Sequence, residues 1–472
     1  MVFSIGGIVF LLFIALLIIL NRDSVEKEFQ GLFLFSIVSN LLLDVGYVAK
    51  IGSFEVLFNY VASVFCFFFA FLVLLKNKGN KVLYIWGLFF FAVVLIGAGT
   101  TILSSRHFQT VGFQDSWDLY FANNQMPGFL GFNSSQFIVM AGRIFLFFFN
   151  LAAFQCCCSR KWILKSSKVF FMVGWIVLAL CFVEFFLDNS LSPSIIRNII
   201  YSLFGKSEAT YDTPRKTLGL YMPLLTSREP SKIASVYFLL ALNSLFTFKR
   251  NYYKKASVFL FVFFSAMLGL TSAMSSILYL IALIGSLVLM SENRIKTGII
   301  LLFMAIPCAL VAFKQFGSRI DVLFNNFASF PNGIGSLPVN SETVRFYSIY
   351  NNLLLFLKNP LFGIGLGIGY SYSGLVTALC NIGILGVICW TGVVISSQSN
   401  LCFKKSTLFW ALLLFFLIFT PVSHMGEMMY QDRSFFLLLL LCSVNRNEQF
   451  GFTFEEKKES IIGLCVSCLE TA

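Results

Sequence analysis

Apolar segments long enough to approach the span of a lipid bilayer recur from one end of this sequence to the other. The 472 residues are 58% hydrophobic and only 12% charged, and the mean hydropathy is +0.84. This composition excludes a water-soluble protein, because so much apolar surface has no place in water. The sequence therefore predicts an all-α fold, specifically that of a polytopic integral membrane protein.

The apolar segments predict roughly 12 to 13 membrane-spanning helices. The first lacks a basic leading region and a small-residue cleavage site, so we expect a retained anchor and not a removed signal. The expected spans are Phe3–Leu20, Gly31–Ala49, Val56–Leu75, Val82–Leu103, Phe137–Cys157, Val169–Leu187, Ile233–Phe248, Ala256–Leu270, Ser272–Met290, Thr297–Phe313, Ser373–Ile395, Thr407–Val422 and Phe435–Val444.

The positive charge of the chain, +12 in total, lies mainly in short loops between the expected spans. Membrane orientation explains it better than nucleic acid, so we expect membrane lipid and no nucleic acid as a partner. The Lys- and Arg-rich loops are then cytoplasmic, which places both long loops on the outer face. The chain divides into N-terminal transmembrane helices (1–188), a first long outer loop (189–232), central transmembrane helices (233–313), a second long outer loop (314–372), C-terminal transmembrane helices (373–444) and a cytoplasmic tail (445–472).

The second long loop contains a helical pattern with one polar face. Ser341, Arg345, Ser348 and Asn352 recur at spacings of four, three and four residues, so they share that face. Asn359-Pro360 stops the pattern, because proline cannot continue a helix. We expect a basic amphipathic helix at the membrane surface.

Four alternate glycines follow: Gly363, Gly365, Gly367 and Gly369. Their spacing differs from a dinucleotide-binding fingerprint, and no strand precedes them. Two interpretations remain open. Their N–H groups form a concavity that binds an anion, or they make a tight turn that allows close helix packing.

A few charged residues fall within or at the edges of expected spans, where charge is costly and marks functional candidates. Asp44 and Arg143 are placed to pair with each other, and Glu184 is close enough to the outer end of its span to reach water. The sequence contains no nucleophile motif, nucleotide-binding loop or metal-ligand set. We therefore expect no cofactor and no metal, and any chemistry must use an activated substrate.

Arginines in the two long loops are candidates for binding an anionic substrate, because guanidinium groups bind phosphates bidentately. The alternative is ordinary solvated or membrane-flanking charge. The candidate residues of the loops are Arg197, Arg215, Arg228 and Glu229 in the first, and Arg345 and Lys358 in the second.

The second half of the chain resembles the O-antigen polymerase and O-antigen ligase superfamily; the first half agrees only in hydropathy. The resemblance rests on Arg345, the run from Asn359-Pro360 through Gly363, Gly365 and Gly367, the run Asn381, Gly383 and Gly386, and two shorter matches at Glu229-Pro230-Ser231 and Leu270-Thr271-Ser272.

The resemblance implies a fold like that of GT-C-type polymerases. It also implies a glycosyltransferase at the outer face of the bacterial inner membrane. Its substrate is an undecaprenyl-diphosphate-linked oligosaccharide, and a chain-length regulator is an implied partner. By position, Arg215, Arg228 and Arg345 correspond to catalytic residues that bind diphosphate and Glu229 to a base, while Arg197, Lys358, Gly363 and Gly365 bind substrate.

Two departures from the family pattern bear on the reaction. Ligases usually carry a histidine where this chain has Ser371-Tyr372-Ser373, which favours a polymerase. The family often has Ser-Arg where this chain has Ser272-Ala273, which puts in doubt any mechanism that needs that arginine. A flippase or transporter of the same lipid-linked substrate, and an O-antigen ligase, are the alternatives.

Overall fold

The computed structural model is mostly helical, in agreement with the expected all-α class. It describes residues 2–42, 46–52, 54–77, 79–103, 108–109, 129–130, 134–191, 195–205, 216–217, 220–223, 225, 230–249, 253–271, 274–290, 321, 325, 341–367, 369 and 374–397. The expected spans Thr297–Phe313, Thr407–Val422 and Phe435–Val444 lie outside these residues.

The elements follow one another along the chain with short strands only in the connections. The helices are α1 (Ile5–Leu20), α2 (Val25–Leu42), α3 (Phe58–Lys76), α4 (Lys81–Leu103), α6 (Ser134–Cys157), α7 (Arg160–Ser190), α8 (Ile195–Phe204), α9 (Pro230–Lys249), α10 (Lys254–Leu270), α11 (Met274–Met290), α13 (Ser341–Lys358) and α14 (Gly374–Ser397). The strands are β1 (Val2–Phe3), β2 (Ala49–Ile51), β3 (Phe54–Val56), β4 (Phe108–Gln109), β5 (Phe129–Leu130), β6 (Lys216–Thr217) and β7 (Leu220–Tyr221).

Within the described ranges, four helical segments are long and apolar enough to cross a membrane: Lys81–Leu103, Phe137–Cys157, Lys161–Ser190 and Leu375–Val393. Helix α4 illustrates why these helices need lipid. Its inner side chain Phe90 is buried in the core, whereas Leu88 and Leu95 on its outer side are 72% and 63% exposed. Leucines so exposed are stable in a hydrocarbon environment, so the chain is a membrane protein.

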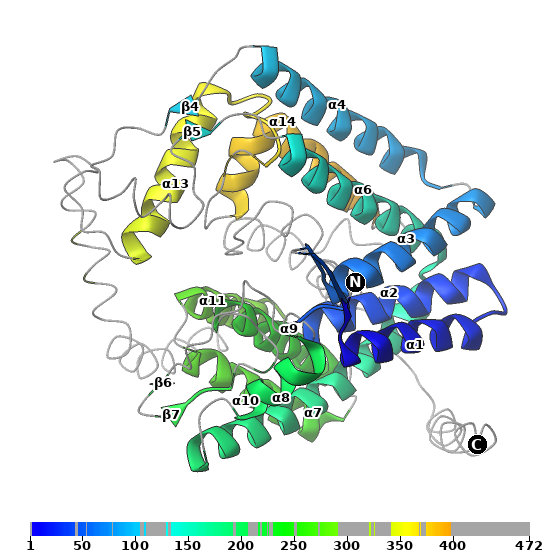
Figure 1. Ribbon diagram of the computed structural model, residues 1–472, viewed down its shortest axis with the longest axis vertical. Coiled ribbons are helices and arrows are strands. Elements are labelled where there is room, and N and C mark those ends of the chain that lie inside the picture. Colours follow the sequence, from blue (N-terminus) through cyan, green and yellow to red (C-terminus); the bar gives the residue numbers. More distant parts are fainter. Residues whose placement is uncertain are drawn as a thin grey trace.

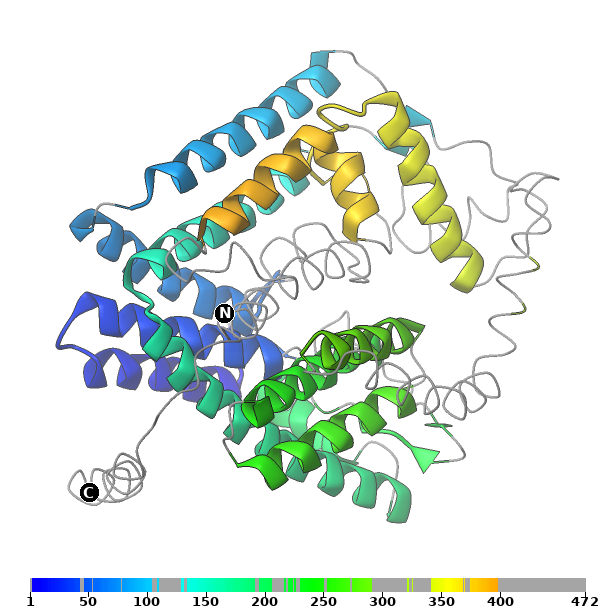
Figure 2. The same ribbon diagram turned by 180° about the vertical axis from the view of Figure 1, so that it is seen from behind.

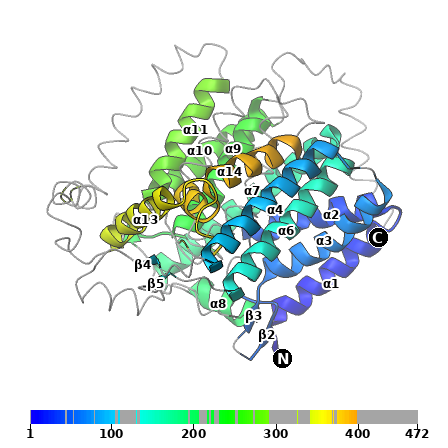
Figure 3. The ribbon, with the colours of Figure 1, turned by 90° about the horizontal axis from the view of Figure 1, so that it is seen from above.

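The helices pack in two groups, which α2 joins through its contacts with α6 and α7. In one group α14 packs on α4, α6 and α13, and α3 lies between α2 and α6 (Figure 1). In the other group α9 packs against α7, α10 and α11, which are seen from behind in Figure 2. The view from above in Figure 3 shows α13 extending away from one end of α14, on which it packs.

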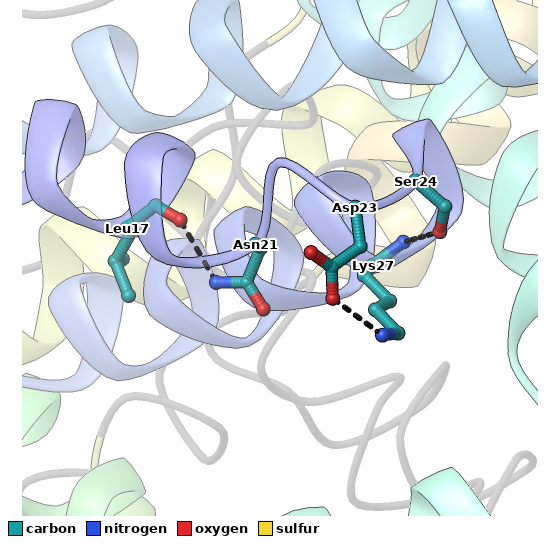
Figure 4. Close-up of polar contacts among 5 residues, drawn as sticks. All are labelled: Leu17, Asn21, Asp23, Ser24 and Lys27. Carbon is teal, nitrogen blue, oxygen red and sulfur yellow. Dashed lines mark hydrogen bonds and ion pairs between the residues drawn. The ribbon is translucent and has the colours of Figure 1, made fainter. Parts of the chain in front are cut away.

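Most expected spans coincide with helices of the structure, but Val169–Leu187 is wrong at its start, because α7 begins at Arg160, and Gly31–Ala49 is wrong at both ends. Helix α2 begins at Val25 and ends at Leu42, and Ala49 lies in β2. The helix begins early because the Ser24 hydroxyl accepts a hydrogen bond from the Lys27 N–H at 3.2 Å (Figure 4). Hydropathy identifies the apolar part of a helix and misses such a polar first turn.

Helix α8 lies within the first long loop, where no helix was predicted. It is joined to the connection between α2 and β2 by a hydrogen bond from the Tyr47 N–H to the Phe204 carbonyl, at 2.9 Å. Nearby, β1, β2 and β3 form an antiparallel sheet in which Val2 pairs with Lys50, and Lys50 with Glu55. The structure thus places this sheet beside α8 of the first long loop, which the charge pattern predicts on the outer face.

An exposed ion pair joins Asp23, in the loop between α1 and α2, to Lys27 in the first turn of α2, with 2.9 Å between Oδ2 and Nζ (Figure 4). The hydrogen bond from Lys27 lowers the pKa of Asp23. Any stability that it contributes is therefore present above the ordinary aspartate pKa and lost as pH falls through the lowered value. Because both side chains are solvated, we expect Asp23→Asn to leave the melting temperature unchanged at pH 7 and at pH 4. A fall of several degrees, measured on detergent-solubilised chain, would contradict this.

Candidate functional site

Helix α13 matches its sequence-based prediction in extent, because it begins at Ser341 and ends at Lys358, before Asn359-Pro360. Its orientation differs from that of a surface helix. Asn352, on the predicted polar face, is buried, whereas the apolar Leu357 is 67% exposed. Arg345 lies about two turns before Asn352 on the same face. The polar face of α13 therefore turns toward the protein interior at Asn352, and the side chains of Ser341, Arg345 and Ser348 on that face lie outside the described residues.

Helix α14 is broken at Gly383, which has φ 64° and ψ −175°. In an unbroken helix the N–H groups of Ile384 and Leu385 would donate to the carbonyls of Cys380 and Asn381, four residues earlier. The break separates these two donors from these two acceptors. In a membrane, main-chain groups left without partners cost several kcal/mol each, so new partners are required.

The glycine segment, residues 359–369, supplies those partners. The Ile364 and Gly365 N–H groups donate to the Cys380 and Asn381 carbonyls, at 2.8 and 3.0 Å. In return, the Pro360 and Leu361 carbonyls accept hydrogen bonds from the N–H groups on the other side of the break, at 2.9 and 3.2 Å. Four main-chain bonds to the glycine segment thus replace the two helical bonds that are lost.

Glycine is required at two points of this junction. Gly363 has φ 71°, and a Cβ there would overlap the main chain of Asn381. A Cβ on Gly383 would overlap the carbonyl of Leu361. Both positions combine a left-handed conformation with close main-chain approach, which only glycine tolerates.

Helix α4 holds the glycine segment from the opposite side. The Thr101 hydroxyl donates a hydrogen bond to the Ile364 carbonyl at 2.6 Å, and a Cβ on Gly97 would lie 2.6 Å from the Phe362 carbonyl. These contacts fix the segment between α4 and α14.

The main-chain hydrogen bonds bear on the two interpretations of the glycines. The Gly363 N–H donates to the Asn359 carbonyl at 3.0 Å, and the Gly365 N–H is used across the break. Two of the N–H groups predicted to bind substrate are therefore engaged within the protein. This geometry agrees with the interpretation as a tight turn with close packing, and it gives no support to anion binding by Gly363 and Gly365.

The remaining candidate residues do not all lie beside this junction. Lys358 is exposed at the end of α13, where it adjoins the glycine segment. Arg197 is buried on α8, which packs on α7 and α1, and its guanidinium lies 6.0 Å from the ring centre of Tyr201. Arg215, Arg228 and Glu229 lie outside the described residues.

Glu184 does not reach water, so the expectation that it lies close enough to the outer end of its span to be solvated is wrong. Its side chain is 2% exposed on α7, and Oε2 accepts a hydrogen bond from the Leu225 N–H at 2.7 Å. Asn189 binds both the N–H and the carbonyl of Tyr221, at 2.9 and 3.0 Å. The end of the first long loop is thereby fastened to the outer end of α7.

Arg143 contacts the ring and the hydroxyl of Tyr60, with the guanidinium carbon 4.6 Å from the ring centre. Its expected partner Asp44 lies outside the described residues. Across the ranges that the structure describes, no group of three or more His, Cys, Asp or Glu side chains is placed to hold a metal ion.

The sequence interpretation missed Thr101 and Asn381 as residues of this junction. Thr101 gave no signal, because threonines are common in apolar helices. Asn381 was noted only as part of a motif, although an asparagine within an apolar span is itself a signal for a polar contact.

No protein-family model matches this sequence, and no curated protein shows significant similarity to it.

Gly383→Ala tests the broken helix. The added Cβ must overlap the Leu361 carbonyl at a left-handed position, so we expect a loss of more than about 2 kcal/mol of stability. The measurement is the thermal unfolding of the chain in detergent. Gly285→Ala, in α11, is the control, because a Cβ there meets nothing within 4 Å. It should be neutral or stabilising by up to about 1 kcal/mol. Equal effects of the two substitutions would contradict the break.

Proposed function

We propose that this chain is an O-antigen polymerase, which joins undecaprenyl-diphosphate-linked oligosaccharide repeat units at the outer face of the bacterial inner membrane. The observation that carries the proposal is the placement of Arg345. By helical spacing it shares the face of α13 on which Asn352 is buried, and that helix leads directly into the glycine segment that closes the break in α14. An arginine on an inward face within a membrane protein marks a site for an anionic partner.

The chemistry fits a chain in which no cofactor is expected. A hydroxyl at the non-reducing end of one repeat unit attacks the anomeric carbon of the growing chain. The new glycosidic C–O bond forms as the bond to undecaprenyl diphosphate breaks, and the diphosphate leaves with the electron pair. The attacking hydroxyl loses its proton to a base. Because the donor is already activated, positioning and charge stabilisation supply the catalysis.

The candidate residues take roles that follow from their charge. Arg215, Arg228 and Arg345 bind the diphosphate and stabilise the negative charge that develops on it. Glu229 accepts the proton of the attacking hydroxyl. Lys358, exposed beside the glycine segment, attracts the anionic carrier. Gly363 and Gly365 contribute by shaping the segment, and a chain-length regulator is the proposed protein partner.

A flippase for the same substrate is the second candidate, because broken membrane helices commonly line the binding sites of transporters. In such sites the freed main-chain groups bind the cargo. Here the carbonyls of Cys380 and Asn381 and the N–H groups of Ile384 and Leu385 are bound by the glycine segment. This favours an enzyme over a transporter. The absence of histidine from residues 371–373 likewise favours a polymerase over a ligase.

Arg345→Ala tests this proposal in a strain that lacks the chain and is complemented with wild type or variant. In the variant, the negative charge on the diphosphate leaving group loses the Arg345 guanidinium that stabilises it. We therefore expect the ladder of O-antigen lengths to disappear from a lipopolysaccharide gel, leaving core with a single repeat unit. Lys254→Ala, an exposed residue at the start of α10, is the control and should restore the full ladder.

Other gel patterns separate the alternatives. Polymerised chains that accumulate on the lipid carrier, with bare core, would indicate a ligase. Bare core with unpolymerised units retained on the cytoplasmic side would indicate a flippase. An unchanged ladder in the strain that lacks the chain would contradict all three assignments.

A further inference from the structure

Asn381 joins α14 to the glycine segment through both its side chain and its main chain. Its Oδ1 accepts a hydrogen bond from the Gly369 N–H at 2.8 Å. Its Nδ2 donates to the Gly369 carbonyl at 2.8 Å and to the Thr377 carbonyl at 2.9 Å. The side chain is 1% exposed, so these bonds form away from water, where leaving such groups without partners is costly.

Gly369 in turn lies between α13 and α14. A Cβ built on it would lie 2.5 Å from Asn352 Oδ1 on α13, and 2.6 Å from Cys380 Sγ on α14. The buried Asn352 therefore rests directly against the residue that Asn381 holds. Fastening Gly369 determines which face of α13 packs against α14.

Arg345 lies on that face, seven residues before Asn352. A rotation of α13 by one residue position is about 100°, which would move this face from the protein interior toward lipid. The contact of Asn352 with Gly369 opposes such a rotation. Two hydrogen bonds of the Asn381 side chain hold Gly369 in the position where it makes this contact, and a third, to the Thr377 carbonyl, fixes the Asn381 side chain itself.

We propose that Asn381 is a positioning residue, which acts through Gly369 and Asn352 to hold Arg345 toward the diphosphate. This inference rests on the proposed polymerase function. It assigns to Asn381 no contact with substrate, so its loss affects the reaction only to the extent that Arg345 is displaced.

A double-mutant cycle tests the inference, with wild-type and variant chains purified in lipid vesicles and supplied with undecaprenyl-diphosphate-linked repeat units from the same strain. The variants are Asn381→Ala, Arg345→Lys and their combination, and the readout is the polymerisation rate per amount of chain. Arg345→Lys keeps the charge but loses the bidentate geometry, so a measurable rate remains. We expect each single substitution to lower the rate about tenfold and the double variant to be no slower than either.

Asn243→Ala is the matched control. Asn243 is also a buried asparagine that joins two helices, with Oδ1 accepting from the Ser167 hydroxyl at 3.0 Å, but it lies on α9. A general loss of packing would act equally at both asparagines. We expect Asn243→Ala to leave the rate per amount of chain within about twofold of wild type. Where Asn381→Ala does not accumulate in the membrane, Asn381→Gln replaces it in the cycle.

Four outcomes overturn the inference. A double variant about a hundredfold slower than wild type would mean that the two residues act independently. A polymerisation rate for the Asn381 variants equal to that of wild type would mean that the hydrogen bonds of Asn381 do not position Arg345. A wild-type chain that forms no polymer, or an Arg345→Lys chain as fast as wild type, would instead overturn the proposed role of Arg345 and the inference with it.

Discussion

The break in α14 is the constraint on which the described site depends. A membrane helix cannot leave main-chain donors and acceptors without partners, so a break at Gly383 is stable only where another segment supplies them. The glycine segment does so with Ile364, Gly365, Pro360 and Leu361, each bonded to a group that the break released. The segment and the break are therefore one structural unit, although about twenty residues separate them in sequence.

This unit explains why the glycines and polar residues of the motif occur together. Gly363 and Gly383 permit the close main-chain approach, Thr101 binds the segment from α4, and Asn381 binds its far end. The separate short motifs thus correspond to two segments of the chain, the glycine segment and the broken part of α14, which are joined by main-chain hydrogen bonds. The function of the unit, in our proposal, is to hold α13 with Arg345 directed inward beside a membrane-embedded diphosphate.

The sequence predicted the helical membrane fold and most helix boundaries, because apolar length and proline are strong local signals. The stop of α13 before Asn359-Pro360 is an example. The sequence did not predict the polar first turn of α2 or helix α8, because hydropathy detects lipid-facing residues and does not detect helix caps or amphipathic connecting helices. For the site, it singled out Arg345 and the glycines. It did not predict that the Gly365 N–H binds α14, because that contact depends on a break that no local pattern announces.

The decisive experiment for the role of Arg345 is a structure of the chain in lipid nanodiscs with an undecaprenyl-diphosphate-linked oligosaccharide bound. We predict that the diphosphate lies against the face of α13 that carries Asn352, in contact with the Arg345 guanidinium, and that the bonds joining residues 360–365 to α14 remain intact. A diphosphate bound elsewhere, with Arg345 directed toward lipid, would contradict this prediction.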